Sequence, residues 1–333
     1  MPPRRGYLDR RASLQTNGMK ICAVFFLAVW TIAFVAYLAY PDHATVSTHL
    51  RGLASTMPLA PSLFQEDATP DYLRSAPFDA STLVDCNHLV MVCGHAITTV
   101  ESLDRINSDF SWSLLPYQRN QDMPASFVSH IEAGVDRAAK DSKSLLVFSG
   151  GQSRASAGPK SEGASYWGVA EHFNWFGNAE QVRPRTVIED YARDSFENLL
   201  FSVCRFKEVV GHYPSRFTVV GYSFKAYRFN SLHRQALGIS TDAFTYIGLD
   251  PPKDSKFDLQ RATQGELENA IKLFADDPYG CSDPALKEKR ENRNPYRRSI
   301  PYSLSSPEIA ELLAWCGPSV YDGALPWDSN AES

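Results

Sequence analysis

Three short motifs are absent from this chain of 333 residues, and each absence excludes a kind of site. There is no Asp-x-Asp pair, with which many glycosyltransferases hold a metal ion and a sugar nucleotide. There is no Cys-x-x-Cys spacing, so a cysteine-based zinc site is not expected. There is also no Asn-x-Ser/Thr sequon, so the chain offers no acceptor for N-linked glycans. We therefore predict no metal site, and a glycosyl- or phosphosugar-processing enzyme of the secretory pathway would have to be metal-independent.

A long basic stripe is also absent from the body of the chain. The net charge is −5, and basic residues cluster only near the two ends, at 4–20 and 287–298. Because nucleic-acid-binding domains carry a basic face, we expect no nucleic-acid partner. Apolar residues make up 44% of the chain and charged residues 21%, which predicts a packed core.

Histidine does not occur after His233, and this bears on the role of Ser223. Gly221-Tyr222-Ser223 resembles the start of a nucleophile elbow, because it follows an expected strand and precedes an expected helix. Lys225 stands where that motif needs a second small residue. The usual order of a Ser–Asp–His hydrolase also requires a histidine late in the chain. The sequence therefore argues against such a hydrolase.

A run without charge spans residues 21–40. About 20 apolar residues cross a bilayer, whereas a signal-peptide core has about 7–15, and no small-x-small cleavage site follows. We predict a single transmembrane helix here. Basic residues precede the run and Asp42 follows it, so the N-terminus is expected in the cytosol and the body in the lumen of the endoplasmic reticulum or Golgi. A buried core helix and a mitochondrial presequence with a sorting helix are the alternatives.

Composition divides the chain into five expected segments. These are a basic tail (1–20), the transmembrane helix (21–40), a stem rich in Pro, Ser, Thr and Ala (41–84), an α/β domain (85–252) and a helical C-terminal extension (253–333). In a luminal body, Cys281 and Cys316 of the extension are candidates for a disulfide. Cys93 and Cys204 lie in apolar runs and are expected to be small core residues.

Short apolar runs alternate with segments of helical spacing after residue 85. Strands are expected at 88–93, 144–149, 186–189, 217–221 and 243–247. Helices are expected at 126–140, 162–176, 194–210 and 225–237. This alternation predicts an α/β fold with a mostly parallel sheet of about five strands and helices on both faces. Ligands of such sheets bind at the carboxyl ends of the strands.

The residues at those strand ends are polar or glycine. The residues expected at the rim of a site are Gly94 and His95, the run from Gly150 to Ser153, Glu189 with Asp190, and the run from Gly221 to Ser223. We predict that Gly150, Gly151 and Gln152 present backbone N–H groups to an anion, although an ordinary strand-to-loop turn explains them equally well.

The acid-rich segment from Glu189 to Asn198 is the most informative part of the sequence. Asp194 or Ser195 can cap the following helix, and Glu197 suits its first turn. The acids together exceed what capping needs, so we predict a functional role for this segment as well.

Five motifs in the α/β domain carry a resemblance to a known family. They are Val92-Cys-Gly94-His95, Phe148-Ser-Gly150-Gly151, Ser161-Glu162, Glu189…Ser195-Phe-Glu197-Asn198 and Ser223-Phe-Lys225-Ala-Tyr-Arg228. Over residues 87–250 the chain resembles the YdcF/SanA-like family (domain of unknown function 218). Lys225 stands where that family usually has histidine. The extension, with Tyr279-Gly-Cys281 and Arg293-Asn-Pro-Tyr296, looks like that of fungal relatives.

The resemblance implies a Rossmann-like, doubly wound fold and a small ligand, with S-adenosylmethionine as a candidate cofactor. Our lead hypothesis is an enzyme-like pocket for a small anionic or nucleotide-type ligand at the strand ends. The expected catalytic residues are Glu197, Glu189 and His95. The expected binding residues are Gly94, Gly150, Gly151, Gln152, Glu162, Asn198, Ser223, Lys225 and Arg228. The second hypothesis is a non-catalytic, membrane-anchored scaffold that recruits a partner through its extension, at 293–302.

Overall fold

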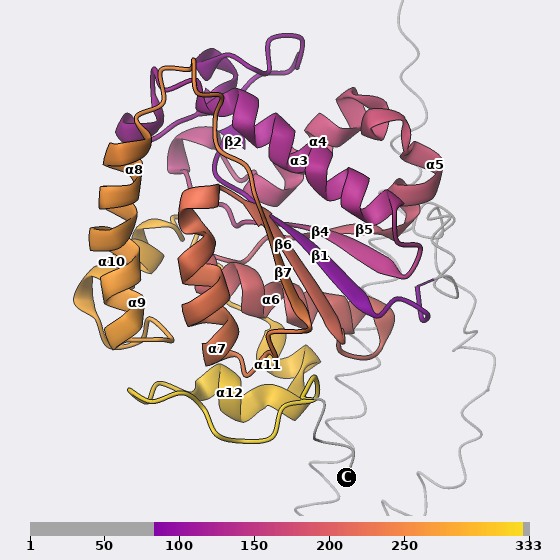
Figure 1. The fold of residues 1–333 in the computed structure, drawn as a ribbon, viewed down its shortest axis with the longest axis vertical. Coiled ribbons are helices and arrows are strands. Elements are labelled where there is room, and N and C mark those ends of the chain that lie inside the picture. Colours follow the sequence, from indigo (N-terminus) through magenta and orange to yellow (C-terminus); the bar gives the residue numbers. More distant parts are fainter. Residues whose placement is uncertain (1–82, 329–333) are drawn as a thin grey trace, which may run out of the picture. The chain divides into compact units, whose positions relative to one another are not determined.

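The computed structural model describes residues 83–328, all of which lie in one unit of the chain. At its centre is a sheet of five parallel strands in the order β5-β4-β1-β6-β7 (Figure 1). The strands are β1 His88–Cys93, β4 Ser144–Ser149, β5 Thr186–Glu189, β6 Arg216–Gly221 and β7 Phe244–Gly248. Counted along the chain this is the order 3-2-1-4-5, which dinucleotide-binding sheets share. The predicted α/β fold with a parallel five-stranded sheet is confirmed.

The two central strands are apolar because helices cover both faces of the sheet. Every residue of β1 and of β4 is buried, as expected for parallel strands with no solvated face. His88 is the polar exception in β1, and both of its ring nitrogens have partners. Nδ1 lies 2.9 Å from Asp141 Oδ2, and Nε2 lies 2.8 Å from Thr218 Oγ1.

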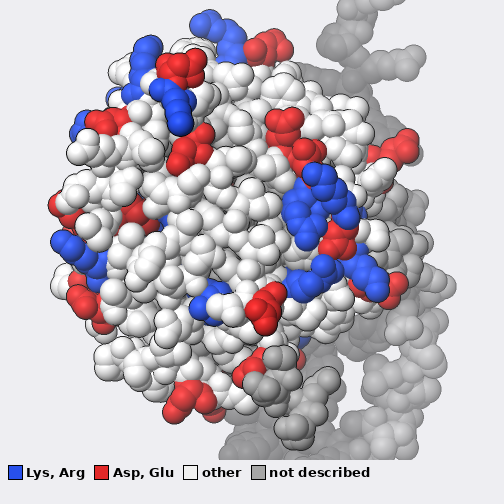
Figure 2. All heavy atoms as spheres, viewed as in Figure 1, with Lys and Arg blue, Asp and Glu red and all other residues white. Residues whose placement is uncertain are grey.

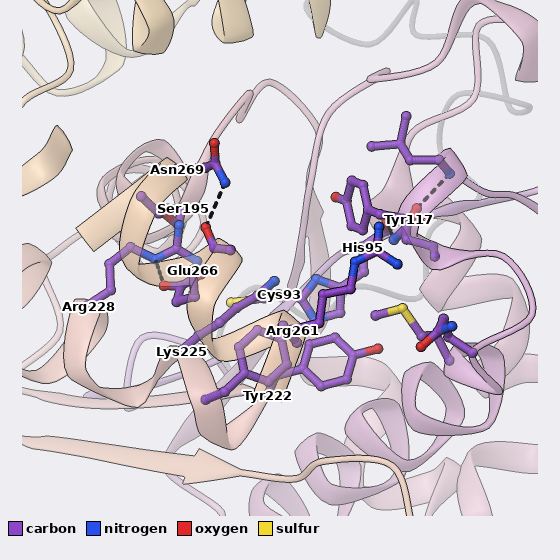
Figure 3. Close-up of a pocket in the computed structure, with 18 of the residues that line it drawn as sticks. Cys93, His95, Tyr117, Ser195, Tyr222, Lys225, Arg228, Arg261, Glu266 and Asn269 are labelled. Atoms are coloured by element: carbon purple, nitrogen blue, oxygen red, sulfur yellow. Dashed lines mark hydrogen bonds and ion pairs between the residues drawn. The ribbon is translucent and has the colours of Figure 1, made fainter. Parts of the chain in front are cut away.

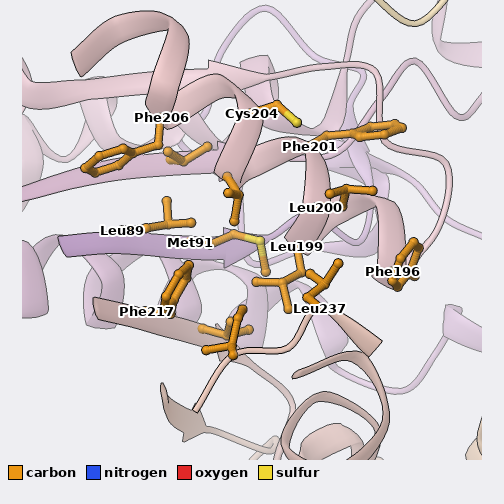
Figure 4. Close-up of a cluster of buried hydrophobic side chains, with 14 of the residues drawn as sticks. Leu89, Met91, Phe196, Leu199, Leu200, Phe201, Cys204, Phe206, Phe217 and Leu237 are labelled. Atoms are coloured by element: carbon orange, nitrogen blue, oxygen red, sulfur yellow. The ribbon is translucent and has the colours of Figure 1, made fainter. Parts of the chain in front are cut away.

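Two hydrophobic clusters sandwich the sheet. Helices α3 (Met123–Ala139), α4 (Glu162–His172) and α5 (Ala179–Val182) cover one face. Helix α6 (Ser195–Val210) covers the other, where Leu199 and Phe206 meet Leu89, Met91 and Phe217 of the strands (Figure 4). The alternation of side-chain direction along each strand therefore divides the core into two layers.

The predicted helices match the structure except at two places. Helix α4 ends at His172, not at residue 176, because Trp175 and Phe176 adopt left-handed backbone angles (φ 53° and 51°). The side chain of Trp175 is fully buried there. The helix expected at 225–237 is a 3₁₀ turn, Ser223–Lys225, then a π-helical segment, Arg228–His233, and a short α7, Arg234–Ala236. The π-helical turn widens the helix next to the strand ends.

A small antiparallel ribbon that the sequence did not suggest lies beside the main sheet. It pairs β2 (Ile97–Thr98) with β3 (Trp112–Ser113). Its strands have two residues each, too few for a periodic signal.

The C-terminal extension is helical, and it shares the core of the α/β domain. Its helices are α8 Leu259–Glu266, α9 Lys272–Asp276, α10 Pro284–Asn292, α11 Tyr302–Ser305 and α12 Ala310–Ala314, with a π-helical segment, Leu267–Ile271, between α8 and α9. Phe274, Leu286 and Tyr302 are buried in the same cluster as α6. Cys281 and Cys316 form a disulfide with Cα atoms 5.5 Å apart, which confirms that candidate pairing.

The sequence also led to predictions for the charge pattern of the surface and for the N-terminal segments. Acidic and basic side chains are interspersed on the face shown in Figure 2, without a continuous basic stripe on that face. Within residues 83–328, none of the helices has the length and apolar character to cross a membrane. The transmembrane helix predicted at 21–40, the basic tail and nearly all of the stem lie outside the described residues.

Close packing of α4 against the ends of β4 and β5 gives a first testable prediction. A Cβ at Gly163 would lie 2.5 Å from the carbonyl oxygen of Phe148, whereas one at Gly168 of the same helix would meet nothing within 4 Å. Gly163→Ala should lower the free energy of unfolding by about 1–3 kcal/mol, because backbone cannot yield to the methyl group. Gly168→Ala should be neutral or stabilising by up to about 1 kcal/mol. Urea denaturation of both variants measures this, and equal midpoints would contradict it.

Candidate functional site

A cavity of about 760 Å³ opens at the carboxyl ends of β1 and β6 (Figure 3). We call it the switch-point cavity, because the strand order reverses between these two strands. Cys93, Gly94 and His95 at the end of β1 line it, and so do Tyr222 and Lys225 after β6. In doubly wound sheets this is where ligands bind, as the strand pattern predicted.

Charged side chains from both the α/β domain and the extension line this cavity. Six are basic and four are acidic: Arg154, Lys225, Arg228, Arg261, Lys289 and Arg293, with Glu162, Asp258, Glu266 and Glu268. Arg228 Nε lies 3.0 Å from Glu266 Oε1, and both side chains are buried. Arg154 Nη2 lies 3.9 Å from Glu162 Oε1. Two of the acids thus neutralise two of the basic residues.

Two lysines of the cavity form no ion pair. Within residues 83–328, neither the Lys225 nor the Lys289 ammonium group makes a hydrogen bond or an ion pair, and Lys225 Nζ lies 5.2 Å from the ring centroid of Tyr222. Burial, followed by the charge of Arg228, lowers the pKa of Lys225 to about 8. Burial, followed by the charges of Arg293 and Arg228, lowers the pKa of Lys289 to about 7. The cavity therefore holds positive charge that its own residues do not balance.

Six of the twelve residues predicted from the sequence line the cavity. They are Gly94, His95, Glu162, Asn198, Lys225 and Arg228. His95 stacks on Tyr222 with ring centroids 4.8 Å apart, and its Nε2 is buried without a hydrogen-bond partner. Burial lowers the pKa of His95 well below its usual value, so the ring is neutral at pH 7.

The two glycines after β4 do not supply free N–H groups, and that prediction is wrong. The N–H of Gly150 donates to the carbonyl oxygen of Glu189 (2.9 Å), and that of Gly151 to the carbonyl oxygen of Ala192 (2.8 Å). The glycines instead permit close packing, because a Cβ at Gly150 would lie 2.7 Å from Glu162 Oε2. Gln152 Nε2 donates to the carbonyl oxygen of Pro159 at 3.2 Å. These residues and Ser223 are not among those that line the cavity.

The two glutamates predicted as catalytic also lie outside the cavity lining. Glu189 is fully buried and accepts hydrogen bonds from Ser149 Oγ (2.8 Å), the Tyr191 N–H (2.7 Å) and Tyr302 Oη (3.1 Å). Burial raises the pKa of Glu189 to about 7. Glu197 pairs with Arg193 and lies 3.3 Å from Arg290 Nε. Both carboxyl groups hold structural partners outside the cavity lining, and their catalytic role stays a prediction.

Several cavity residues were missed because they come from the extension or from loops. Lys289 and Arg293 lie on and just after α10, Glu266 ends α8, and Arg154 follows the two glycines. The basic cluster at 287–298 was visible in the sequence, but we gave a role only to 293–302, as a candidate partner surface. Its charge was the signal that could have linked it to an anion site.

The unpaired Lys289 gives a prediction for stability. The pKa of Lys289 is about 7 in the folded protein and about 10.4 in an unfolded chain, so its destabilising effect is greatest below pH 7 and lessens as pH rises from 7 to 10. Lys289→Met should therefore have a higher Tm than the wild type at pH 6.5, and the difference should shrink by pH 9.5. Lys287→Met, on the exposed side of the same helix, is the control. A Tm difference for Lys289→Met that does not change with pH would count against unpaired burial of this charge.

Comparison with known proteins finds one relative and no assigned activity. The chain is 27% identical over 261 residues to a protein of Saccharomyces cerevisiae (strain ATCC 204508 / S288c) named "Uncharacterized protein YOR238W". The match covers 66% of this chain and 85% of the yeast protein. No protein-family model and no solved structure matches the chain. The chain is thus similar to a fungal protein, which agrees with the fungal character expected of its extension.

Proposed function

We propose that the switch-point cavity binds a small anionic ligand, which supplies the negative charge that the cavity lacks. The observation that carries this proposal is the pair of partly buried lysines, Lys225 and Lys289, whose ammonium groups form no ion pair among the described residues. A buried charge without a partner destabilises a fold, and such groups concentrate at functional sites.

The family resemblance supports the same location and leaves the reaction open. The doubly wound strand order supports the Rossmann-like assignment, and the resemblance to YdcF/SanA-like proteins supports a small ligand at the strand ends. His95 lines the cavity as a neutral imidazole with an unpartnered nitrogen. We keep His95 as the candidate for proton transfer, because it is the one residue predicted to be catalytic that lines the cavity.

S-adenosylmethionine does not fit the charges of this cavity. Its sulfonium group is positive, and Lys225, Lys289 and Arg293 already place positive charge there without matching acids. Of the four acids that line the cavity, Glu266 is paired with Arg228 and Glu162 accepts a hydrogen bond from Ser153. The other two, Asp258 and Glu268, are exposed and accept hydrogen bonds within α8 and the segment after it. A nucleotide or a phosphosugar carries the charge of the required sign. We therefore propose a phosphorylated ligand.

The alternative of a non-catalytic scaffold has less support. The segment suspected as a partner surface holds the extension to the α/β domain: Arg298 Nη1 lies 2.9 Å from Asp190 Oδ2, and Tyr302 is buried against Glu189. A pull-down from cells tests the scaffold. The scaffold would be favoured if a captured partner is lost on substitution of exposed residues of the extension, such as Leu304, but is retained by Lys289→Met.

Pyrophosphate binding tests the proposal. We expect calorimetry on the purified full-length chain to show binding at pH 6.5, and Lys225→Met and Lys289→Met each to weaken it about tenfold, because each removes a charge-assisted contact. Lys287→Met should bind as the wild type does. Wild-type affinity should also fall between pH 6.5 and 9, as the lysines with pKa values of about 7 and 8 lose their protons. Equal affinity in all variants would show that the anion binds elsewhere.

We also propose that residues 21–40 anchor the chain and that the α/β domain lies on the non-cytosolic side. The Cys281–Cys316 disulfide supports this side, because disulfides persist in oxidising compartments. A tag placed after Ser333 should be protected from protease in intact vesicles and digested once detergent is added. Digestion without detergent would reverse the orientation, and recovery of the chain with mitochondria would favour the mitochondrial alternative.

A further inference from the structure

One wall of the switch-point cavity is a stack of four aromatic rings. The ring planes of His95 and Tyr222 differ by 28°, with centroids 4.8 Å apart. Tyr222 stacks in turn on Phe224 (26°, 5.1 Å) and lies nearly parallel to Phe257 (10°, 6.2 Å), while Phe224 and Phe257 differ by 30° at 5.8 Å. All four residues line the cavity. We call this set the aromatic wall.

The aromatic wall is assembled from separate parts of the fold, so the stacking of its rings does not follow from one element. His95 follows β1, Tyr222 and Phe224 follow β6, and Phe257 precedes α8. Tyr222 is fully buried and fixes the stack, whereas Phe224 and Phe257 are partly exposed. Lys225 Nζ lies 5.2 Å from the Tyr222 centroid and 5.6 Å from that of Phe224, which places positive charge beside the wall.

A further tyrosine stands at the rim next to this wall. Tyr117 lines the cavity with 61% of its side-chain surface exposed, and Figure 3 shows it beside His95. Its turn is held there because Gln118 Nε2 donates to the carbonyl oxygen of His95 at 3.0 Å. In the same view Arg228 lies at the opposite side of the cavity from Tyr117. The cavity therefore has aromatic rings at its wall and rim, and basic side chains both beside the wall (Lys225) and opposite the rim (Arg228).

We infer that the ligand carries a planar aromatic ring in addition to its anionic group, as a nucleotide does. The inference rests on the proposed anion site, and it assigns the aromatic part of the cavity to the planar ring of the ligand. A phosphate alone needs neither a cavity of about 760 Å³ nor an apolar wall. Flat rings stack on aromatic side chains with little dependence on the base, and a nearby cation adds to the attraction.

The test compares ligands that share the anion and differ in the ring. Binding of ADP, GDP, CDP and UDP to the purified full-length chain is measured by calorimetry beside pyrophosphate and glucose 1-phosphate. We expect at least one nucleoside diphosphate to bind about 5- to 100-fold more tightly than pyrophosphate, which is the range that stacking of one base supplies. Glucose 1-phosphate, whose ring is not aromatic, should gain no such advantage.

One variant in the aromatic wall, one at the rim and two matched controls locate the ring of the ligand. Phe257→Leu and Tyr117→Leu should reduce the advantage of the nucleotide at least fivefold and leave pyrophosphate binding within twofold. Phe110→Leu and Tyr227→Leu change exposed rings outside the cavity lining (72% and 57% exposed) and should have no effect.

The outcomes separate the two proposals. If pyrophosphate binds but no nucleotide binds more tightly, or if Phe257→Leu and Tyr117→Leu leave the nucleotide advantage intact, the planar-ring inference is wrong and the anion site stands. Glucose 1-phosphate binding as tightly as the best nucleotide would overturn it equally. If no phosphorylated compound binds at all, the anion site itself is wrong, and the inference built on it is wrong as well.

Discussion

The guanidinium of Arg290 joins the C-terminal extension to the start of α6, and the composition of the switch-point cavity depends on this contact. Arg290 Nε lies 2.6 Å from Asp194 Oδ2 and 3.3 Å from Glu197 Oε1, and its Nη atoms donate to the carbonyl oxygens of Tyr279 and Gly280. Lys289 precedes Arg290 in α10, and Arg293 follows it by three residues. Buried ion pairs of this kind contribute little net stability but fix geometry. Here they set two basic side chains at the cavity.

The same principle accounts for the acid-rich segment that follows β5. Glu189 accepts from Tyr302, the Asp190 carboxylate pairs with Arg298, and Asp194 with Arg290. Three acids within six positions thus hold three residues of the extension, each about 100 residues later in the chain. The segment exceeds the needs of helix capping because it carries the docking of the extension. The acids are therefore partners of the extension, and the chemistry of the cavity falls to residues around them.

The sequence allowed prediction of those features that depend on a local pattern of apolar and polar residues. Apolar runs of strand length predicted all five strands of the main sheet, because burial imposes a period on neighbouring residues. Of the residues expected at the strand ends, Gly94 and His95 line the cavity, whereas Gly150 and Glu189 do not. Pairs such as Asp194 with Arg290 leave no period, so the contacts of Glu189 and Glu197 with the extension could not be predicted. The π-helical turn at 228–233 was missed for a related reason. Its Arg228 pairs with Glu266, which is distant in the sequence, and such a contact leaves no local pattern. One signal was present: an acid-rich segment at 189–197 and a basic one at 287–298 complement each other in charge.

The division of labour in the cavity follows from this docking. Residues after β1 and β6 supply three of the four rings of the aromatic wall. These two strand ends lie side by side because of the strand order of the sheet, independently of the extension. The extension supplies Lys289 and Arg293, and the pKa of Lys289 is lowered by its burial and then by the charge of Arg293. The ion pairs of Arg290 with Asp194 and Glu197 hold α10 in that position. The like charges around Lys289 act against the same arrangement. An anion in the cavity would remove the second effect. Binding should therefore tighten the contact between extension and sheet, and not the sheet itself.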